Sequence, residues 1–403
     1  MADTLRRRVG VGLLTTYGIG VMVGAGIYVL VGAVAGTAGD LAWLAFVLAG
    51  LVALPSALSF AELSSRVPQA GGAAAYMRAA FGSAALAGLV GLAMVAAGTI
   101  SAAAVLRGGV GYLTGIFAID PTLAIIGLGV VLTAIAIWGV VESLGFAAIL
   151  TAVEVTGLVL VITAGLLAAP VPVPVLEQSD PLPGVAPAIM GILAATALAF
   201  FAFIGFEDMV NLAEETRDPE RNVPRAIIMA LALVSVLYAA VAFSATRAVP
   251  AQVLAASDRP LALVWQAWTG GSVVFLSAIA VAAALNGVLA QIVMAARVLF
   301  GLGREGGLFG VFHHASDRLG TPVLGSILVG GAVIASAVLL PVATLAEISA
   351  SVLLAVFVLV NIALLRMNSR DPEAPAFAVP RAVPWFGLVA SIAALGASMA
   401  DLG

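Results

Sequence analysis

The stretch GIGVMVGAGIY, residues 18–28, decides the fold because it interrupts a hydrophobic run that extends from about Val9 to Ala35. The interruption is Gly24-Ala25-Gly26, and the run around it is long enough to cross a bilayer. A second long run is broken in the same way at FIGF, residues 203–206. Inside lipid, non-helical backbone persists only where it faces protein, water or a ligand. Two such breaks, one in each half of a membrane protein, predict a central binding site.

The composition places the whole chain in the membrane. Of 403 residues, 63% are hydrophobic and 9% are charged, whereas a soluble domain is about 25% charged. The chain has no Cys, and its two His residues are adjacent, so we expect no disulfide, no metal centre and no cofactor. A net charge of −4 gives no reason to expect nucleic acid as a partner. The lipid bilayer is therefore the first partner that the sequence predicts.

Apolar runs of about 20 residues mark the helices that cross the hydrocarbon core. We count about eleven such spans, which predicts an all-α integral membrane protein. The predicted spans are residues 9–35, 41–65, 84–112, 121–140, 143–169, 187–212, 225–248, 273–302, 323–341, 343–366 and 383–400.

The placement of Arg residues predicts the orientation, since cytoplasmic loops carry the excess of positive charge. With the N-terminus inside, 14 of the 17 basic residues fall on the cytoplasmic side. Those 14 are Arg6, Arg7, Arg8, Arg66, Arg78, Arg217, Arg221, Arg225, Arg297, Arg304, Arg318, Arg366, Arg370 and Arg381. The predicted outer loop, residues 170–186, contains no Arg. We therefore expect a multi-pass protein of the cell membrane with a cytoplasmic N-terminus.

The span order divides the chain into two inverted units, because an odd number of spans reverses the topology of the next unit. We predict a cytoplasmic N-terminus and two five-span repeats, each of which opens with a broken helix. The predicted boundaries are residues 1–8 for the N-terminus, 9–169 for the first repeat, 170–186 for the outer loop, 187–366 for the second repeat, and 367–403 for a cytoplasmic loop and an eleventh span.

The two breaks differ in the chemistry they offer. At Gly24-Ala25-Gly26 a helix restarts, so free amides and the positive end of a helix dipole point at the gap and suit a carboxylate. At the second break, the carbonyls of Phe203 and Ile204 can accept hydrogen bonds from an ammonium group, while Phe203 and Phe206 supply an apolar wall. Together these groups suit a zwitterion. Close helix packing is the alternative role for the glycines. If Gly24 and Gly26 bind substrate, replacing Gly26 with Leu should abolish substrate binding while the protein stays folded.

Four blocks of this sequence resemble the amino acid–polyamine–organocation superfamily, most closely its prokaryotic permeases of the cationic-amino-acid-transporter type. The blocks are GIGVMVGAGIYVLVG (18–32), ELSSRVPQAGGAAAYMRAAFG (62–82), FFAFIGFEDMVNLAEETRDPERNVPRAI (200–227) and LNGVLAQIVMAARVLFGLGREG (285–306). The resemblance implies a leucine-transporter-type fold with five-plus-five inverted repeats and discontinuous first and sixth helices. It implies that Gly24, Ala25 and Gly26 bind the carboxylate of an amino acid. It likewise implies that Phe203, Ile204, Gly205 and Phe206 bind its amino group and side chain.

Glu154 lies near the centre of the fifth span and is the candidate for ion coupling. A carboxylate at that depth costs about 2.5–3.5 kcal/mol on insertion scales, so it is retained for a reason. Related permeases often have Lys at the aligned position, and its absence here prevents a direct transfer of their mechanism. Glu154 could carry a proton or help to hold Na⁺. The alternatives are a protonated Glu bonded to a neighbouring Thr, or a structural pair.

Four further polar residues are candidates for a gate or pathway. Glu62, one turn before Arg66, fits a structural pair or a gate element better than a substrate ligand. Glu207 and Asp208 follow the second break and either line the inner pathway or pair with nearby Arg residues. For Asn286 and for Gln291, the side chain either faces a cavity or makes an interhelical hydrogen bond. The polar loop 214–224 either latches the inner face or is simply solvated.

These observations predict a secondary active amino acid transporter that works by alternating access and is proton-coupled. The substrate would be a neutral or cationic amino acid, and the coupling ion H⁺ or Na⁺. A passive facilitator, a channel, or an exchanger for amino acids or polyamines is the alternative. No nucleotide-binding motif and no catalytic constellation is present in the sequence, so we expect neither ATP drive nor an enzyme. The sequence leaves the oligomeric state open.

Overall fold

The structure is a computed structural model. It describes residues 7, 9–69, 71–138, 144–169, 185–303, 307–314, 316, 320–370 and 375–401. Most of the predicted N-terminal segment and outer loop lie outside the described residues, as do Arg304 and Arg318.

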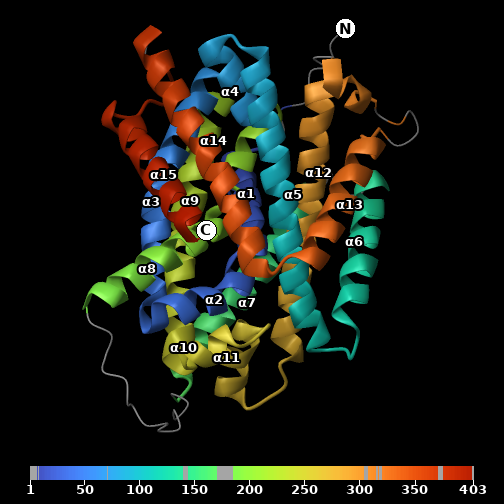
Figure 1. The fold of residues 1–403 in the computed structure, drawn as a ribbon, viewed down its shortest axis with the longest axis vertical. Coiled ribbons are helices and arrows are strands. Elements are labelled where there is room, and N and C mark those ends of the chain that lie inside the picture. Colours follow the sequence, from blue (N-terminus) through green and yellow to red (C-terminus); the bar gives the residue numbers. More distant parts are fainter. Residues whose placement is uncertain are drawn as a thin grey trace.

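The described chain is built from helices, and the backbone bridge between Val9 and Thr216 is its one pairing of extended segments. The longer helices run side by side along the long axis of the molecule (Figure 1). They are α1 Val11–Ala25, α2 Ile27–Ala38, α3 Ala42–Arg66, α5 Ala84–Thr114, α6 Pro121–Trp138, α7 Leu144–Leu167, α8 Val185–Phe200, α9 Pro219–Ala248, α12 Val274–Gly303, α13 Val323–Leu339, α14 Val342–Arg370 and α15 Ala382–Asp401.

Shorter helices cover the two ends of this bundle. α4 (Gly72–Phe81) lies at the end where the chain begins, and α10 (Ala251–Ala255) and α11 (Pro260–Thr269) lie at the opposite end (Figure 1). The first end, where α3, α12 and α14 also finish, is called the N-terminal face below. Three short 3₁₀ helices, η1 Gly39–Leu41, η2 Phe201–Phe203 and η3 Phe206–Glu215, interrupt or join the long helices, and η4 Gly307–Phe312 follows α12.

The all-α membrane fold predicted from the sequence is confirmed. Eight helical stretches among the described residues are long and apolar enough to cross a membrane, and three shorter apolar helices accompany them. Each of the eleven predicted spans contains such a helix, within a few residues of its predicted ends. The five-plus-five inverted repeat and the domain boundaries derived from it stay predictions.

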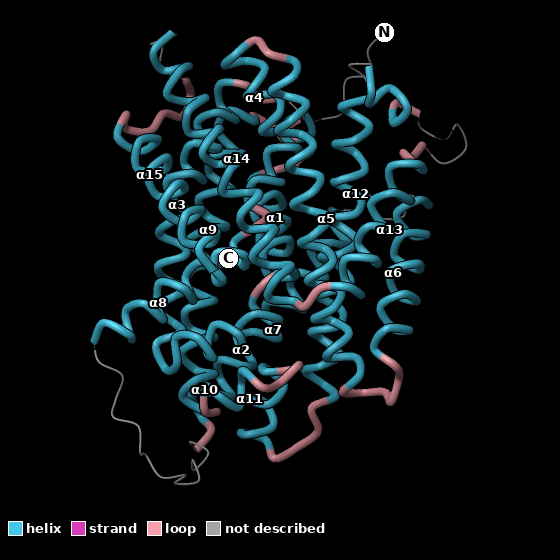
Figure 2. Tube along the Cα trace, in the orientation of Figure 1, coloured by secondary structure: helices cyan, strands magenta, loops and turns pink. Residues whose placement is uncertain are grey.

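Local sequence explains where several helices start and stop. Ser83 caps α5, because its hydroxyl accepts a hydrogen bond from the amide of Leu86 at 3.2 Å. Pro121 occupies the first turn of α6, where its missing N–H costs nothing, and the Asp120 carboxylate accepts from the Leu123 amide at 3.0 Å. Loops therefore gather mostly at the two ends of the bundle (Figure 2).

The helices that carry the two breaks occupy the middle of the bundle. α1 packs against α7, α9, α12 and η3, and α2 packs against α8 and α10. α5 and α12 form one extensive contact beside them, and α3 and α9 form another. Both breaks are therefore enclosed by protein rather than exposed to lipid, as membrane physics requires.

Candidate functional site

The first break is a single residue wide. α1 ends at Ala25, Gly26 has φ −116° and ψ −61°, and α2 begins at Ile27. The first turn of α2 bonds back to Gly26, whose carbonyl oxygen accepts from the Val29 amide at 3.3 Å and from the Leu30 amide at 2.9 Å. Because the first amides of a helix have no partner within that helix, the start of α2 directs donors at the break, with the positive end of its dipole behind them.

The second break consists of an extended residue followed by a glycine whose positive φ angle is unfavourable for other residues. Ile204 is extended, with φ −60° and ψ 131°, and Gly205 has φ +127° before η3 begins. The carbonyl oxygen of Ile204, which lies between η2 and η3, accepts no backbone hydrogen bond among the described residues. The predicted break is thus confirmed as a helix interruption, and it presents acceptors where the first break presents donors.

The two breaks lie against each other, although about 180 residues separate them in the sequence. A Cβ atom added to Gly26 would overlap Ala202, the residue before Phe203. A Cβ atom on Gly205 would lie 2.7 Å from Val21 Cγ1 and 3.2 Å from the amide nitrogen of Met22, in the last turns of α1. Glycine at both positions allows this contact.

Close packing also explains Gly24. A Cβ atom there would lie 3.0 Å from the carbonyl oxygen of Ala283 and 3.4 Å from Cα of Gly287, both in α12. The packing alternative therefore holds for Gly24 and Gly26 alongside the helix break. The expectation that Gly26→Leu would leave the protein folded is wrong, because a Leu side chain has no room beside Ala202. The side chain of Ala25 lies outside the described residues.

The two aromatic residues of the second break are buried in separate ring clusters. The Phe203 ring packs edge-on against Tyr238 of α9 with centroids 5.3 Å apart. The Phe206 ring lies 5.3 Å from Phe357 of α14 and 5.9 Å from Phe60 of α3. These contacts anchor the break to three neighbouring helices, α9, α14 and α3.

Glu154 and Asn286, two separate candidates in the sequence, meet in the structure. The Asn286 amide donates to Glu154 Oε1 at 3.0 Å and joins α12 to α7. The other oxygen, Oε2, is buried and has no hydrogen-bond partner. Thr151 and Thr156 bond to carbonyls of their own helix, so the predicted Thr partner for Glu154 is not formed. Glu154 is 1% exposed, and one neutral amide is its only described partner.

Two tyrosines connect these features, and sequence reasoning missed both. The Tyr28 hydroxyl, two residues after Gly26, donates to the backbone carbonyl of Glu154 at 2.8 Å. The Tyr238 hydroxyl donates to the carbonyl of Ala202 at 3.0 Å, next to the second break. Buried aromatic hydroxyls require a partner, and that requirement was the signal available in the sequence. The breaks and Glu154 therefore form one connected region.

Glu207 and Asp208, which follow the second break, line a small cavity between that break and the N-terminal face. It offers about 20 Å³ for the centre of a water molecule, which is room for about one water. Glu207 Oε2 accepts from the Gly205 amide at 3.0 Å, and Asp208 Oδ2 accepts from Gln291 at 2.9 Å. Neither carboxylate makes an ion pair with Arg among the described residues. Gln291 also forms the interhelical bond that the sequence allowed.

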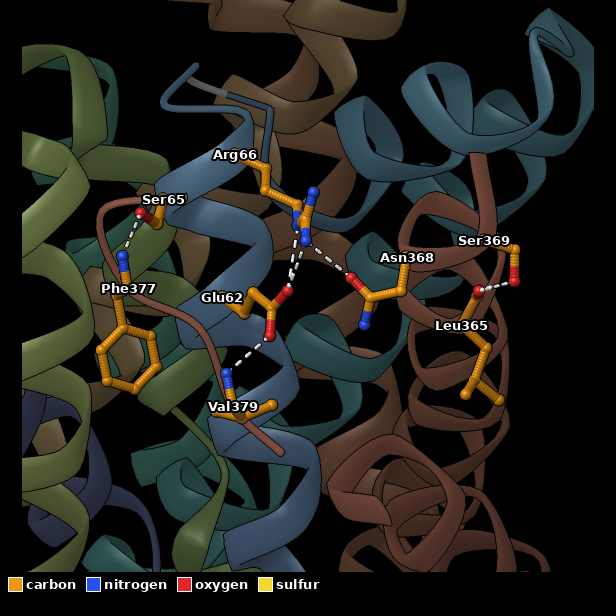
Figure 3. A network of polar contacts seen from close by, with 8 residues as sticks. All are labelled: Glu62, Ser65, Arg66, Leu365, Asn368, Ser369, Phe377 and Val379. Carbon is orange, nitrogen blue, oxygen red and sulfur yellow. Dashed lines mark hydrogen bonds and ion pairs between the residues drawn. The ribbon is translucent and has the colours of Figure 1, made fainter. Parts of the chain in front are cut away.

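Glu62 belongs to a polar network at the N-terminal face (Figure 3). Its Oε1 accepts from Arg66 Nη2 at 2.8 Å, and its Oε2 accepts from the Val379 amide at 2.8 Å. Arg66 also donates to Asn368 of α14 at 2.7 Å, and Ser65 accepts from the Phe377 amide at 3.1 Å. The predicted pair is formed, and it ties α3 to α14 and to the segment before α15.

A second connection at the same face joins the two interrupted segments. The Val9 amide donates to the Glu215 carbonyl at 3.0 Å, and the Arg217 amide donates back to Val9 at 2.9 Å. Thr216 between them is fully buried. Part of the polar loop 214–224 is thus paired with the chain before α1, which favours a latch over a merely solvated loop.

Two broken helices that meet inside a bundle of apolar helices are the features of a membrane transport protein. Comparison with known proteins agrees: a family model described as amino acid permease matches residues 12–401, and the chain belongs to this family.

The similar proteins span bacteria, plants and animals. The chain is 30% identical to the branched-chain amino acid permease BcaP of Bacillus subtilis, over 94% of this chain and 84% of that protein. It is also 30% identical to the methylthioribose transporter of the same organism, over 94% and 85%. It is 32% identical to the vacuolar cationic amino acid transporter 2 of Arabidopsis thaliana, over 82% of this chain and 54% of the plant protein.

Proposed function

We propose that this protein is a secondary active transporter that moves amino acids across the cell membrane by alternating access. The observation that carries the proposal is the contact between the two breaks, with the first amides of α2 on one side and the carbonyl of the extended Ile204 on the other. A zwitterion placed between them would bind its carboxylate at the start of α2 and its ammonium group at the Phe203 and Ile204 carbonyls.

Alternating access accounts for the tightness of this contact. Gly26 and Gly205 leave no space for a side chain at the point where the breaks meet, so a substrate requires α1 and η2 to separate. The five-plus-five inverted repeat gives a reason for the symmetry of that movement, since each repeat contributes one broken helix. The Val9–Thr216 bridge and the Glu62 network would then be contacts of a closed N-terminal face.

The names of the relatives favour an amino acid as the substrate but do not agree on one compound. Their names give a branched-chain amino acid, methylthioribose and cationic amino acids. The buried rings of Phe203 and Phe206 favour a neutral amino acid with an apolar side chain. Glu207 and Asp208 would favour a cationic one only if a long side chain reached them toward the N-terminal face. We therefore propose a neutral amino acid first and a cationic one second.

Glu154 is our candidate for proton coupling. A carboxyl group that is buried beside one amide donor is stable there as the neutral acid, and its unpartnered Oε2 can hold the proton. Tyr28 links its backbone to the first break, so the protonation state of Glu154 and the position of α2 can influence each other. Ionised Glu154 holding Na⁺ is the alternative, which would need more oxygen ligands than Asn286 supplies.

The orientation of the proposed transporter follows from its Arg residues. Arg66, Arg366 and Arg370 end their helices at the N-terminal face, and Arg78 lies on α4 at the same face. The positive-inside rule then makes this face cytoplasmic.

A thermal-shift screen of the purified protein against the amino acids and polyamines tests the substrate class. A ligand at a hundred times its Kd stabilises the folded state by about 2.7 kcal/mol, which is readily measured. Compounds that stabilise should then accumulate above equilibrium in proteoliposomes under an inward proton gradient. Uptake that only equilibrates would instead identify a passive facilitator.

The absence of Cys makes the location of the site testable by thiol labelling. Ala202 is buried while the breaks are in contact, so we expect Ala202→Cys to be labelled by a small thiol reagent when α1 and η2 separate and to be protected by saturating substrate. Ser272→Cys, on an exposed loop at the opposite face, is the matched control and should be labelled equally with and without substrate. Substrate that is transported but leaves Ala202→Cys labelling unchanged would place the site elsewhere.

A further inference from the structure

A groove on the outer surface of the bundle combines positive charge with an apolar floor. It lies at the N-terminal face between α4, α14 and α15 and encloses about 510 Å³. Phe81, Arg366, Arg370 and Trp385 contribute to its lining. None of its lining residues belongs to either break, and the groove takes no part in the proposed transport mechanism.

The two arginines converge on one backbone atom. Arg366 Nε and Arg370 Nη1 donate to the carbonyl oxygen of Ala80, at 2.9 Å and 3.0 Å. Arg366 also stacks over the Phe81 ring, 5.2 Å from its centroid. Two guanidinium groups are thus held side by side at the end of α4, where the helix dipole supplies only a partial negative charge.

This pair of charges is not compensated by the described protein. The groove lining contains no carboxylate, and each guanidinium keeps most of its five donors unused in the described structure. Both side chains are exposed. The next acidic residues in the sequence, Asp371 and Glu373, lie outside the described residues. Adjacent like charges repel, so an anion with several acceptor oxygens fits here better than water.

The rest of the groove is suited to hydrocarbon. Ile362 and Leu365 precede the arginines on α14, and Leu388 of α15 faces the same space. Trp385 is 59% exposed at its edge, and Trp is enriched where membrane meets water. With 29 residues, α14 is about 43 Å long and exceeds the hydrocarbon thickness of about 30 Å. Its last turn, which carries both arginines, therefore reaches the headgroup layer.

We propose that this groove binds one anionic phospholipid, with the phosphate on Arg366 and Arg370 and an acyl chain along Ile362, Leu365 and Leu388. A soluble anion would use only the charged half of the groove. A second copy of the chain would have to bring acidic groups to the arginine pair. A lipid of the leaflet at the N-terminal face supplies both the anion and the hydrocarbon.

Binding of phosphatidylglycerol to the purified full-length protein tests the proposal, with phosphatidylcholine as the neutral lipid. Native mass spectrometry should detect one retained phosphatidylglycerol, and the melting temperature should rise with that lipid but not with phosphatidylcholine. The double variant Arg366→Gln/Arg370→Gln should weaken binding about tenfold or more, since each arginine near a membrane surface contributes about 1 kcal/mol. The matched control Arg225→Gln/Arg381→Gln removes the same charge from the same face outside the groove and should bind normally.

The double variant also loses the hydrogen bonds from Arg366 and Arg370 to α4, so a second variant that keeps both arginines is needed. Leu388→Trp fills the apolar half and keeps both arginines, so it should also weaken phosphatidylglycerol binding. Equal losses in the groove and control variants would mean diffuse surface charge and would overturn the proposal. Normal binding by Leu388→Trp, with inorganic phosphate competing as well as lipid, would overturn it in favour of a soluble anion. Dimers that dissociate in the groove variants would assign the surface to a second copy.

Discussion

Glu62 and Glu154 are two carboxylates with the same burial, 1% exposed each, and very different surroundings. Glu62 lies at the N-terminal face and uses both oxygens, one on Arg66 and one on the Val379 amide. Glu154 lies in the middle of α7 and uses one oxygen on the neutral Asn286 amide. Burial alone therefore does not distinguish a structural carboxylate from a functional one; the partners do.

The difference follows from the cost of a buried charge. A carboxylate with a guanidinium and an amide donor is stable as the ion, and it holds together the elements that supply those partners. A carboxylate with one neutral partner is more stable when protonated, so it can gain or lose a proton as its surroundings change. The partners therefore support our proposal that Glu62 helps to close one face and that Glu154 takes part in coupling.

The largest expected effect is on stability, in Arg66→Met. This substitution leaves Glu62 as a buried charge without its cation and should destabilise the protein by about 3–5 kcal/mol. Thermal unfolding in detergent measures the loss. The exposed Arg225→Met on α9 is the control and should change stability by less than about 0.5 kcal/mol. If Arg66→Met and Arg225→Met are equally stable, the Glu62–Arg66 pair does not stabilise the fold.

The next effect is on transport, in Glu154→Gln. The amide keeps the shape of the side chain and an oxygen for Asn286 but cannot exchange a proton. Accumulation driven by an inward proton gradient should fall to equilibration, while exchange of labelled for unlabelled substrate continues. The same substitution at Glu62 should lower stability and leave the dependence on the gradient intact. Full gradient-driven accumulation by Glu154→Gln would exclude it from coupling.

The smallest effect tests whether Glu154 and Asn286 act as a pair. Asn286→Ala should cost about 1–3 kcal/mol, because it leaves both oxygens of a buried carboxyl without a partner. Combined with Glu154→Gln, it should depart from additivity by at least about 0.5 kcal/mol. Gln291→Ala, whose recorded side-chain partner is Asp208, should combine additively with Glu154→Gln. Additive behaviour of both pairs would mean that the Asn286 contact is incidental.

The local features of the fold and the site could be predicted from sequence. The apolar runs locate the helices, and the glycines mark both breaks within a residue or two. The Glu62–Arg66 pair follows from a separation of four residues on one helix. Each of these depends on neighbours in the chain, whose relative positions the helix geometry sets.

Contacts between distant residues could not be predicted in this way. Nothing in the sequence pairs Glu154 with Asn286, 132 residues away, or Gly24 with Gly287. The prediction that Gly26→Leu stays folded is wrong for the same reason, since Ala202 approaches Gly26 only in the folded protein.

By itself the sequence determined that this chain is a helical membrane protein with two broken spans, because hydropathy and backbone geometry act over a few residues. Tertiary structure alone decided that the breaks touch, that Tyr28 and Tyr238 support them, and that Glu154 is left with one amide partner. Those outcomes depend on how helices far apart in the chain pack, and packing is a property of the whole bundle rather than of any one segment.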